Sequence, residues 1–327
     1  MITFIVRRLL AMIPTLVLVS VLTFIVIELP PGDFMTQLAA NVGTSGSSMD
    51  AATVANLQRQ YGLDQPAYIR YLTWISGFPR GDFGYSLDWK RPVNELIMDR
   101  LGLTLLLSFL SLGLMWIVAV PIGIYSATHQ YSLGDNLLTL LGFLGLSVPD
   151  FLLGLVYLFM GIFVFGVSVT GLYSSAMENA PWSPAKVLDL AIHLFPPAII
   201  LGVGGMAQLI RIMRGSLLEI LGQQYITTAR AKGLKENVVI NKYAVRVAIN
   251  PLISVMGMQL PHLINGAVVL GIVLTLPTTG PLFMRALLSQ DMYLAGTFLL
   301  FLALMLMLGN LLADVALAWA DPRIRLE

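Results

Sequence analysis

The sequence predicts an all-α integral membrane protein with six transmembrane helices. Hydrophobic residues make up 57% of its 327 residues and charged residues only 11%, whereas about 25% of the residues in an ordinary soluble domain are charged. A helix needs about 20 apolar residues to cross the hydrocarbon core of a bilayer. Six apolar runs near or above this length lie at 9–29, 101–128, 133–165, 190–212, 251–276 and 293–320. This composition excludes a soluble globular enzyme.

The charge balance and the cysteine content exclude further classes. The chain has 19 basic and 18 acidic residues, for a formal net charge of +1. It therefore has neither a basic field to hold nucleic acid nor an acidic tail to solvate a disordered chain. It has no cysteine, which excludes disulfides, thiolate metal sites and a cysteine nucleophile.

The first apolar run is expected to be an uncleaved span. It follows Arg7 and Arg8, has no ionisable residue before Glu28, and ends in Leu29-Pro30-Pro31-Gly32. A cleavable signal peptide has a shorter apolar core and a cleavage site of small residues. The run reaches bilayer length, so we expect it to stay in the membrane.

The third run, at 133–165, is long enough to contain a break. Within it lies Ser147-Val148-Pro149-Asp150. Proline lacks a backbone N–H and clashes with the preceding helical turn, so a kink or a split costs least at this point.

Basic residues predict the orientation, because Lys and Arg in short loops stay on the cytoplasmic side. The loops after spans three and five carry only Lys186 and Arg285, and we expect them on the outer side. Seven basic residues lie between spans four and five: Arg211, Arg214, Arg230, Lys232, Lys235, Lys242 and Arg246. Six spans then place both termini in the cytoplasm.

The predicted organisation has three parts: residues 1–29 with the first span, an extracytoplasmic loop region at 30–100, and a five-helix core at 101–327. In the outer loop, a Gly/Ser-rich stretch at 43–48 precedes a predicted helix from Asp50 to Tyr61, for which Asp50 is a good N-cap and Gly62 a stop. Loops of this length are usually functional or disordered. The loop is either a lid over the bundle or a docking surface for a soluble partner.

The cytoplasmic loop at 213–250 is predicted to contain a helix outside the membrane, from Leu217 to Ala231, followed by a stop at Gly233. The three-and-four spacing places five residues on one face of that helix, namely Leu217, Leu218, Leu221, Tyr225 and Thr228. The alternative is an amphipathic helix that rests on lipid headgroups. The narrow apolar face fits that alternative poorly.

Motifs of catalysis and of nucleotide binding are absent from the sequence. It has no Gly-x-x-x-x-Gly-Lys-Ser/Thr, His-Glu-x-x-His or Gly-x-Ser-x-Gly sequence. The three histidines, His129, His193 and His262, are far apart and have no metal-ligand spacing. We therefore expect no metal site, no cofactor and no catalytic residue in this chain.

Ionisable residues inside the predicted spans are few, and each is costly in lipid unless it faces protein, water or an interface. Glu28 and Asp314 lie near span ends, where headgroups can contact them. Asp150 and His262 are candidates for a polar pathway, and His193 is a further residue of this kind. A proton-coupled carrier normally has a chain of such groups at mid-depth, and their small number disfavours it.

The inner loop resembles a known signature. Residues 225–234 read Tyr-Ile-Thr-Thr-Ala-Arg-Ala-Lys-Gly-Leu, and Arg246-x-Ala248-x-Asn250-Pro251 follows. This resembles the EAA-type loop of ABC importer permeases, in the form of the dipeptide, oligopeptide and nickel permease family. Further landmarks in the family's order lie at 7–9, 31–33, 61–66, 81–86, 211–219 and 321–325. The resemblance covers nearly the whole chain.

The resemblance implies a permease subunit in a bacterial-type inner membrane. It implies a second related permease, in a heterodimer, that completes the pathway, one or two ATPase subunits that hold ATP and Mg, and an extracytoplasmic substrate-binding protein. The residues expected to couple to the ATPase are Tyr225, Thr228, Ala229, Arg230, Ala231, Lys232, Gly233 and Leu234. Those expected to dock the binding protein are Gly81, Asp82, Phe83, Gly84, Tyr85 and Ser86. Those expected along the pathway are Asp150, Ser254, Gln259, His262 and Asn265.

Two departures from the family pattern concern the substrate. Thr227-Thr228-Ala229 stands where the broader importer class often has Glu-Ala-Ala, which favours the peptide branch. The stretch at 269–281 lacks the Trp-Pro-Gly-x-Gly sequence of many peptide permeases. Peptides therefore remain one expectation, and oligosaccharides or opines another. The alternative from a different class is a secondary carrier that works without an ATPase.

Overall fold

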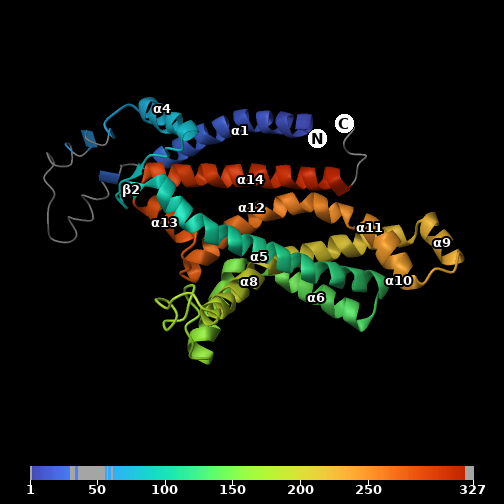
Figure 1. The fold of residues 1–327 in the computed structure, drawn as a ribbon. Helices are drawn as coiled ribbons and strands as arrows, with labels where there is room; N and C mark the ends of the chain where they lie inside the picture. Colours follow the sequence, from blue (N-terminus) through green and yellow to red (C-terminus); the bar gives the residue numbers. More distant parts are fainter. Residues whose placement is uncertain (1, 30–33, 36–55, 57, 60–61, 321–327) are drawn as a thin grey trace. The chain divides into compact units, whose positions relative to one another are not determined.

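The computed structural model describes residues 2–29, 34–35, 56, 58–59 and 62–320 of the chain. Most of them are helical, and the one sheet has two short strands, which confirms the all-α prediction (Figure 1). The chain divides into two compact units. The first contains residues 104–277 and the chain from 306 onward, and the second contains residues 2–103 and 278–305. Helices α5 (Val93–Thr128) and α14 (Met292–Ala320) each contribute to both units.

Five helices are long and apolar enough to cross a membrane: α1 (Ile2–Glu28), α5, α8 (Pro184–Leu221), α12 (Asn250–Val273) and α14. The third predicted run forms α6 (Leu133–Ser147), α7 (Asp150–Phe159) and the π-helical turn η2 (Met160–Val164). Counted as one bent span, they complete the predicted six.

The predicted break in the third run is confirmed. The two arms of this span differ in direction by 96°. Val148 is extended, as expected for a residue before proline, and Pro149 is the N-cap of α7. The proline ring thus ends α6 and allows α7 to start in a new direction.

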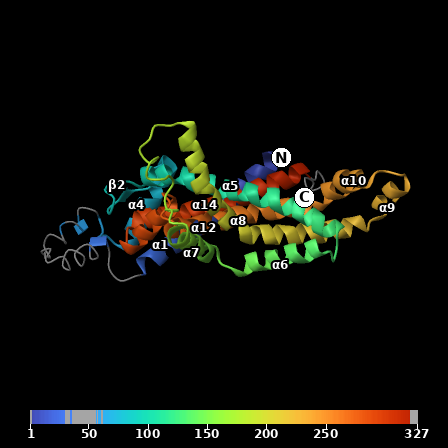
Figure 2. The same ribbon diagram turned by 90° about the horizontal axis from the view of Figure 1, so that it is seen from below.

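In the first unit, α8 is the central helix. It packs along α6 and α12, and it also contacts α7. Figure 2 shows α6 running beside the second half of α8. Small residues allow this approach: a Cβ atom added at Gly142 would lie 3.6 Å from Cβ of Ala207, and one added at Gly145 would lie 2.6 Å from Cγ1 of Val203. The α6–α8 contact therefore depends on glycine at these positions.

The prediction of one helix from Leu217 to Ala231 is wrong. Residues Leu217–Leu221 are the last turns of α8, and a separate helix, α9, covers Gln224–Ala231. Gly222 and the extended Gln223 separate the two helices. The short elements α10 (Glu236–Val238), η3 (Val239–Ala244) and α11 (Val245–Ala248) follow and lead into α12.

The second unit is built around α1, α4 (Ala67–Gly77), α13 (Thr279–Leu288) and the first part of α14. A short turn, η1 (Phe78–Arg80), and a two-stranded antiparallel hairpin, β1 (Tyr85–Ser86) with β2 (Arg91–Pro92), follow α4. Trp74 of α4 is buried beside Phe24 of α1, and its Nε1 donates a hydrogen bond to Oγ1 of Thr297 at 3.2 Å. This contact joins three helices in one core.

Glu28 was expected to contact lipid headgroups, because it lies near the end of a span. The structure instead shows a partner for it within the chain. Its carboxylate forms an ion pair with Arg70 of α4. The sequence could not reveal this pair, because the two residues are 42 positions apart.

The predicted helix Asp50–Tyr61 and the Gly/Ser-rich stretch 43–48 lie mostly outside the described residues. Residues 56, 58 and 59 are helical, and Gly62 has a left-handed φ of +66°. The N–H of Gly62 donates to the carbonyl of Arg59, as expected at a helix end. The family landmarks at 31–33 and 321–325 also lie outside the described residues.

Candidate functional site

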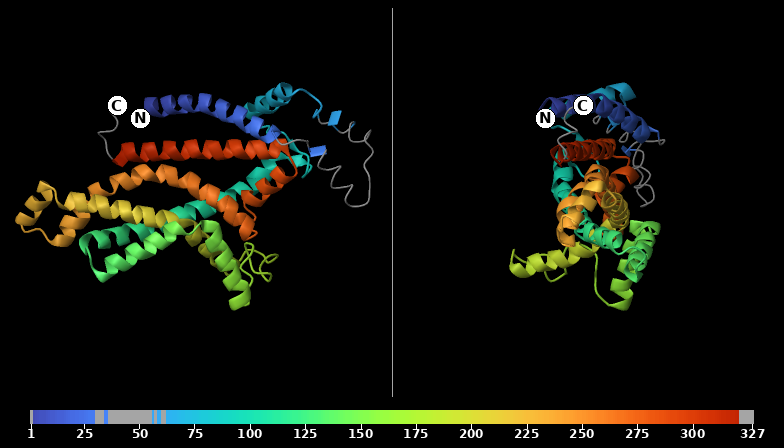
Figure 3. Two further views of the ribbon diagram at one scale, coloured as in Figure 1. Left: turned by 180° about the vertical axis from the view of Figure 1, so that it is seen from behind. Right: turned by 90° about the vertical axis from the view of Figure 1, so that its right-hand side faces the viewer.

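The segment that connects α8 to α12, residues 222–249, forms a cap at one end of the first unit. Figure 3 shows it beyond the turn between α5 and α6. Its core is buried: Ile226, Val239, Ala244 and Ala248 have no exposed surface and belong to one apolar cluster with Met213 of α8. This shared core joins α9 to the two long helices that precede and follow it.

The exposed face of α9 differs from the predicted one. Tyr225 and Thr228 were expected on an apolar face, but both are exposed. Ile226 and Ala229 are the buried residues of this eight-residue helix. Ala229 was expected to contact the ATPase, but its side chain faces the interior of this chain. The other seven predicted coupling residues are exposed: Tyr225, Thr228, Arg230, Ala231, Lys232, Gly233 and Leu234.

The predicted stop at Gly233 is confirmed. Gly233 has a φ of +76°, and its N–H donates to the carbonyl of Arg230 at 2.9 Å. A Cβ atom added at Gly233 would meet no atom of the described chain within 4 Å. Glycine is needed here for its backbone conformation, not for a close contact within this chain.

Arg230 has a partner that the sequence analysis missed. Its guanidinium contacts the carboxylate of Glu236, with Nη2 2.7 Å from Oε1. This pair raises the pKa of Arg230 and lowers that of Glu236. Both side chains are exposed, so the pair is accessible to a partner that approaches α9.

Helix α12 presents three of the predicted pathway residues on one exposed stripe. Ser254, His262 and Asn265 are exposed, and their spacing of eight and three places them on one helix face. Gln259 is not on this stripe. It is buried, and its Nε2 donates to Oε1 of Gln208 on α8 at 3.0 Å. Gln259 is therefore a packing contact between α8 and α12.

Asp150 lies at the start of α7, where the bent span turns. A Cβ atom added at Gly266 of α12 would lie 3.2 Å from Oδ2 of Asp150, and one at Gly204 of α8 would lie 4.0 Å from Oδ1. Gly266 lies one helical turn from His262 on α12. The break in the third span thus places Asp150 beside the part of α12 that carries His262, which neither residue's position in the sequence shows.

The predicted docking segment, residues 81–86, is partly buried. Ser86 has no exposed surface, and its Oγ donates to Oδ2 of Asp291 at 2.5 Å. Gly84 lies under Tyr293, whose Cδ1 would be 2.6 Å from an added Cβ atom. The exposed residues of the segment are Gly81, Asp82 and Tyr85. Much of this motif therefore holds the outer loop against the start of α14.

Asp291 and Arg285 are structural residues of this loop that the sequence analysis missed. Burial raises the pKa of Asp291, and the hydrogen bond from Ser86 opposes this shift. Arg285 donates to Asp88, with Nε 2.6 Å from Oδ2, and its guanidinium lies 4.6 Å from the centre of the Trp89 ring. The sequence could have predicted a structural role for Asp291, because the residue lies just before a long apolar run and aspartate is a preferred helix N-cap.

Comparison with known proteins matches residues 119–326 to the family described as the binding-protein-dependent transport system inner membrane component. The chain belongs to this family. Residues 1–108 match the N-terminal region of such membrane components. It is thus a multi-pass inner membrane protein and the permease subunit of a binding-protein-dependent importer, not a catalytic subunit.

Several relatives of this permease match along their full length. The oligopeptide transport system permease protein AppB of Bacillus subtilis is 36% identical, over 99% of each chain. A putative peptide permease protein of Brucella ovis is 34% identical, again over 99% of each chain. The glutathione transport system permease protein GsiC of Escherichia coli K12 is 33% identical, with the same coverage.

Within the part of the permease that the structure describes, no three His, Asp or Glu side chains are close enough to hold a metal ion. Gln259 pairs with Gln208 within the bundle, whereas Ser254, His262 and Asn265 lie on the exposed stripe of α12.

Proposed function

We propose that this permease forms half of a translocation pathway for peptides and transmits the movement of cytoplasmic ATPase subunits through α9. The observation that carries the proposal is the shared core of the cap. Ile226 of α9 is buried in the same cluster as Met213 of α8 and Leu252 of α12. Packed interiors are close to incompressible. A partner that displaces α9 must therefore move both long helices with it.

The exposed residues around α9 supply the contact surface for the ATPase. Arg230, Lys232 and Glu236 present charges of both signs, and Gly233 allows the chain to turn closely after the helix. Complementary charges of this kind fix the orientation of a partner more than they add affinity. ATP and Mg belong to the ATPase subunits, and one or two ATPase chains and a second permease, in a heterodimer, complete the machine.

The pathway is proposed to run along the exposed stripe of α12. Ser254, His262 and Asn265 line it, and Asp150 at the bend of the third span lies beside Gly266, one helical turn from His262. Weak polar contacts let a solute leave as readily as it enters. Selection of the substrate then depends mainly on the extracytoplasmic binding protein, which we place at the exposed residues Gly81, Asp82 and Tyr85 of the outer loop.

Peptides are the proposed substrate class because the names of the relatives point to them: oligopeptides for AppB and glutathione for GsiC. Oligosaccharides and opines are the alternative for the same machine. In this proposal the cap around α9 and both termini lie in the cytoplasm, since the cap holds most of the basic residues of the short loops.

Replacing Gly233 by aspartate tests the coupling role. The left-handed conformation costs a residue with a Cβ atom about 1–2 kcal/mol, and the new charge faces the partner. We expect the variant to reach the membrane and to lose ATP-driven peptide uptake, measured in proteoliposomes that contain the complete transporter and its binding protein.

Gly166→Asp is the matched control. Gly166 also has a left-handed φ, of +66°, with no atom within 4 Å of an added Cβ, but it follows η2, far along the chain from α9. It should retain uptake. Unchanged uptake in Gly233→Asp would contradict the coupling role, and uptake by the wild type without ATP would favour a secondary carrier.

A further inference from the structure

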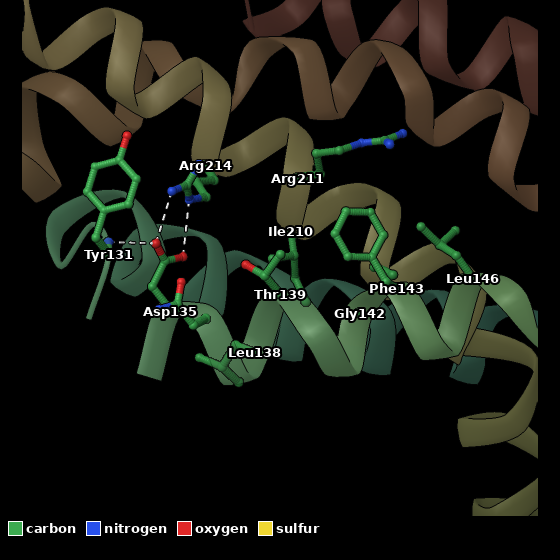
Figure 4. A pocket seen from close by; sticks show the side chains of 12 residues that line it. Tyr131, Asp135, Leu138, Thr139, Gly142, Phe143, Leu146, Ile210, Arg211 and Arg214 are labelled. Carbon is green, nitrogen blue, oxygen red and sulfur yellow. Dashed lines mark hydrogen bonds and ion pairs between the residues drawn. The ribbon is translucent and has the colours of Figure 1, made fainter. Parts of the chain in front are cut away.

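A groove between α6 and α8 lies outside the coupling cap and the α12 stripe. It has a volume of about 290 Å³ and is open on one side (Figure 4). Its walls differ along its length. One end is polar and lies where α6 begins after the turn from α5, and the other end is formed by Phe143 and Leu146. The groove is therefore amphipathic along the axis of α6.

The polar end contains one arginine that is paired and one that is not. Arg214 contacts Asp135 through two hydrogen bonds, of 3.2 and 2.9 Å, and Tyr131 donates its backbone N–H to the same carboxylate. Arg211, one turn away on α8, lines the same groove. Within the described part of the chain, Arg211 has no hydrogen-bond or ion-pair partner. Figure 4 shows its side chain pointing away from the Arg214–Asp135 pair, toward the end with Phe143 and Leu146.

Arg211 is exposed and lies near the α9 end of the long helix α8, where an anionic partner would stabilise its charge, since an ionised side chain is costly in hydrocarbon. Asp135 cannot serve, because its carboxylate already receives Arg214 and Tyr131. A phosphate fits the planar guanidinium well and accepts two hydrogen bonds from it. The apolar end of the groove then has to hold an apolar group that is attached to the phosphate.

The dimensions of the groove match a lipid. From Asp135 to Leu146 the helix advances about 16 Å at 1.5 Å per residue, from the level of the α5–α6 turn into the depth of the membrane. Basic pockets between transmembrane helices on the cytoplasmic side are known to bind anionic headgroups. The α5–α6 turn is on the same side as α9 (Figure 3), which is cytoplasmic in the orientation proposed above.

We infer that the α6–α8 groove binds an anionic phospholipid of the leaflet on the side of α9, with its phosphate on Arg211 and an acyl chain along Phe143 and Leu146. The bound lipid fills the open side of the contact between α6 and α8. It thereby supports the arm of the bent span that ends at Pro149. The site depends on the charge of Arg211 and on the open space beside Thr139, and each can be removed separately.

The test uses the transporter purified with its partners and placed in nanodiscs of phosphatidylcholine with or without phosphatidylglycerol. Lipids that remain bound after gentle detergent extraction are counted by native mass spectrometry. Arg211→Gln removes the charge, and Thr139→Trp fills the groove while the charge stays. Arg246→Gln is the matched control, since Arg246 is an exposed arginine on the same side of the chain and does not line the groove.

We expect the wild type and Arg246→Gln to retain one more phosphatidylglycerol than Arg211→Gln and Thr139→Trp. Removal of one basic residue near an anionic surface should weaken retention about fivefold, which corresponds to about 1 kcal/mol. Equal retention by Arg211→Gln and the wild type would overturn the proposal. So would cross-linking of the Phe143→Cys variant to the second permease in the lipid-filled disc, because the groove would then be covered by protein.

Discussion

At the scale of single residues, the outer loop is held by buried polar contacts. Ser86 donates to Asp291, and the backbone N–H groups of Leu294 and Asp88 also point to that carboxylate. Buried carboxylates need such donors, because an unsatisfied charge in the interior is costly. The contact joins β1 to the start of α14, so a change in the charge of Asp291 acts on the hairpin that contains Ser86.

The raised pKa of Asp291 gives a pH prediction. Burial favours the protonated form, so the folded state holds a proton that the unfolded state has released. The stabilising contribution is complete below about pH 4, the ordinary pKa of aspartate, and is lost as the pH rises through the raised value. We expect the thermal stability of the purified transporter to fall over this range, and Asp291→Asn to remove that part of the pH dependence. If the thermal stability of the wild type and that of the variant changed in parallel with pH, this prediction would be contradicted.

At the scale of elements, α9 depends on its buried face. Ile226 is fully buried in the cluster that contains Met213 and Leu252. The helix has only eight residues, and a helix this short is not stable without packing. In the proposed coupling role, the exposed charges of α9 transmit the movement of the ATPase only while this packing holds.

Ile226→Ala should therefore weaken coupling without removing any exposed residue. Truncation of a buried isoleucine to alanine costs about 2–5 kcal/mol, and we expect much of that loss to appear as local opening of the cap. ATP hydrolysis per peptide transported should rise, as measured in proteoliposomes. Thr227→Ala, at an exposed neighbouring position, is the control. An unchanged ratio in Ile226→Ala would show that the cap does not transmit movement through this contact.

The face of α12 can be tested by cysteine labelling, because the natural chain has no cysteine. We expect a hydrophilic maleimide to label Ser254→Cys and Asn265→Cys in the assembled transporter, since these residues lie on the exposed stripe. Gln259→Cys should stay protected, because position 259 is buried against α8. Protection of all three positions would place the stripe against another helix and remove it from the pathway.

At the scale of the whole molecule, the orientation decides which partner meets which surface. Ser168 follows the bent span and Gln224 begins α9, and both are exposed. We expect Ser168→Cys to react with a membrane-impermeant maleimide in intact spheroplasts, and Gln224→Cys to react only after the membrane is permeabilised. The reverse pattern would invert the proposed topology and move the ATPase contact away from α9.

How far the sequence predicts the structure depends on the range of the interactions involved. The break at Pro149 and the stop at Gly233 are local: one follows from a missing N–H, and the other from a left-handed φ that glycine adopts without strain. Both were confirmed. The boundary between α8 and α9 is also local, yet it was missed, because the three-and-four pattern continued across Gly222 and Gln223 without a visible change.

Long-range pairs were not predictable in the same way. Ser86 and Asp291 are 205 positions apart, and Arg214 and Asp135 are 79 positions apart. Nothing in the neighbourhood of either residue indicates its partner. Ala229 and Gln259 had been expected to face a partner or a pathway, and both are buried, because helix rotation depends on the neighbouring helices.

The sequence by itself determined the membrane class, the place of the break and the stop at Gly233, because apolar length, proline and glycine act through local interactions. Only the tertiary structure decided which side of each helix is inside. The burial of Ile226 in place of Tyr225, and the exposed stripe of α12 beside a buried Gln259, follow from how α8 packs against its neighbours. Packing of this kind sums many weak contacts over distant parts of the chain, and no single stretch of sequence contains it.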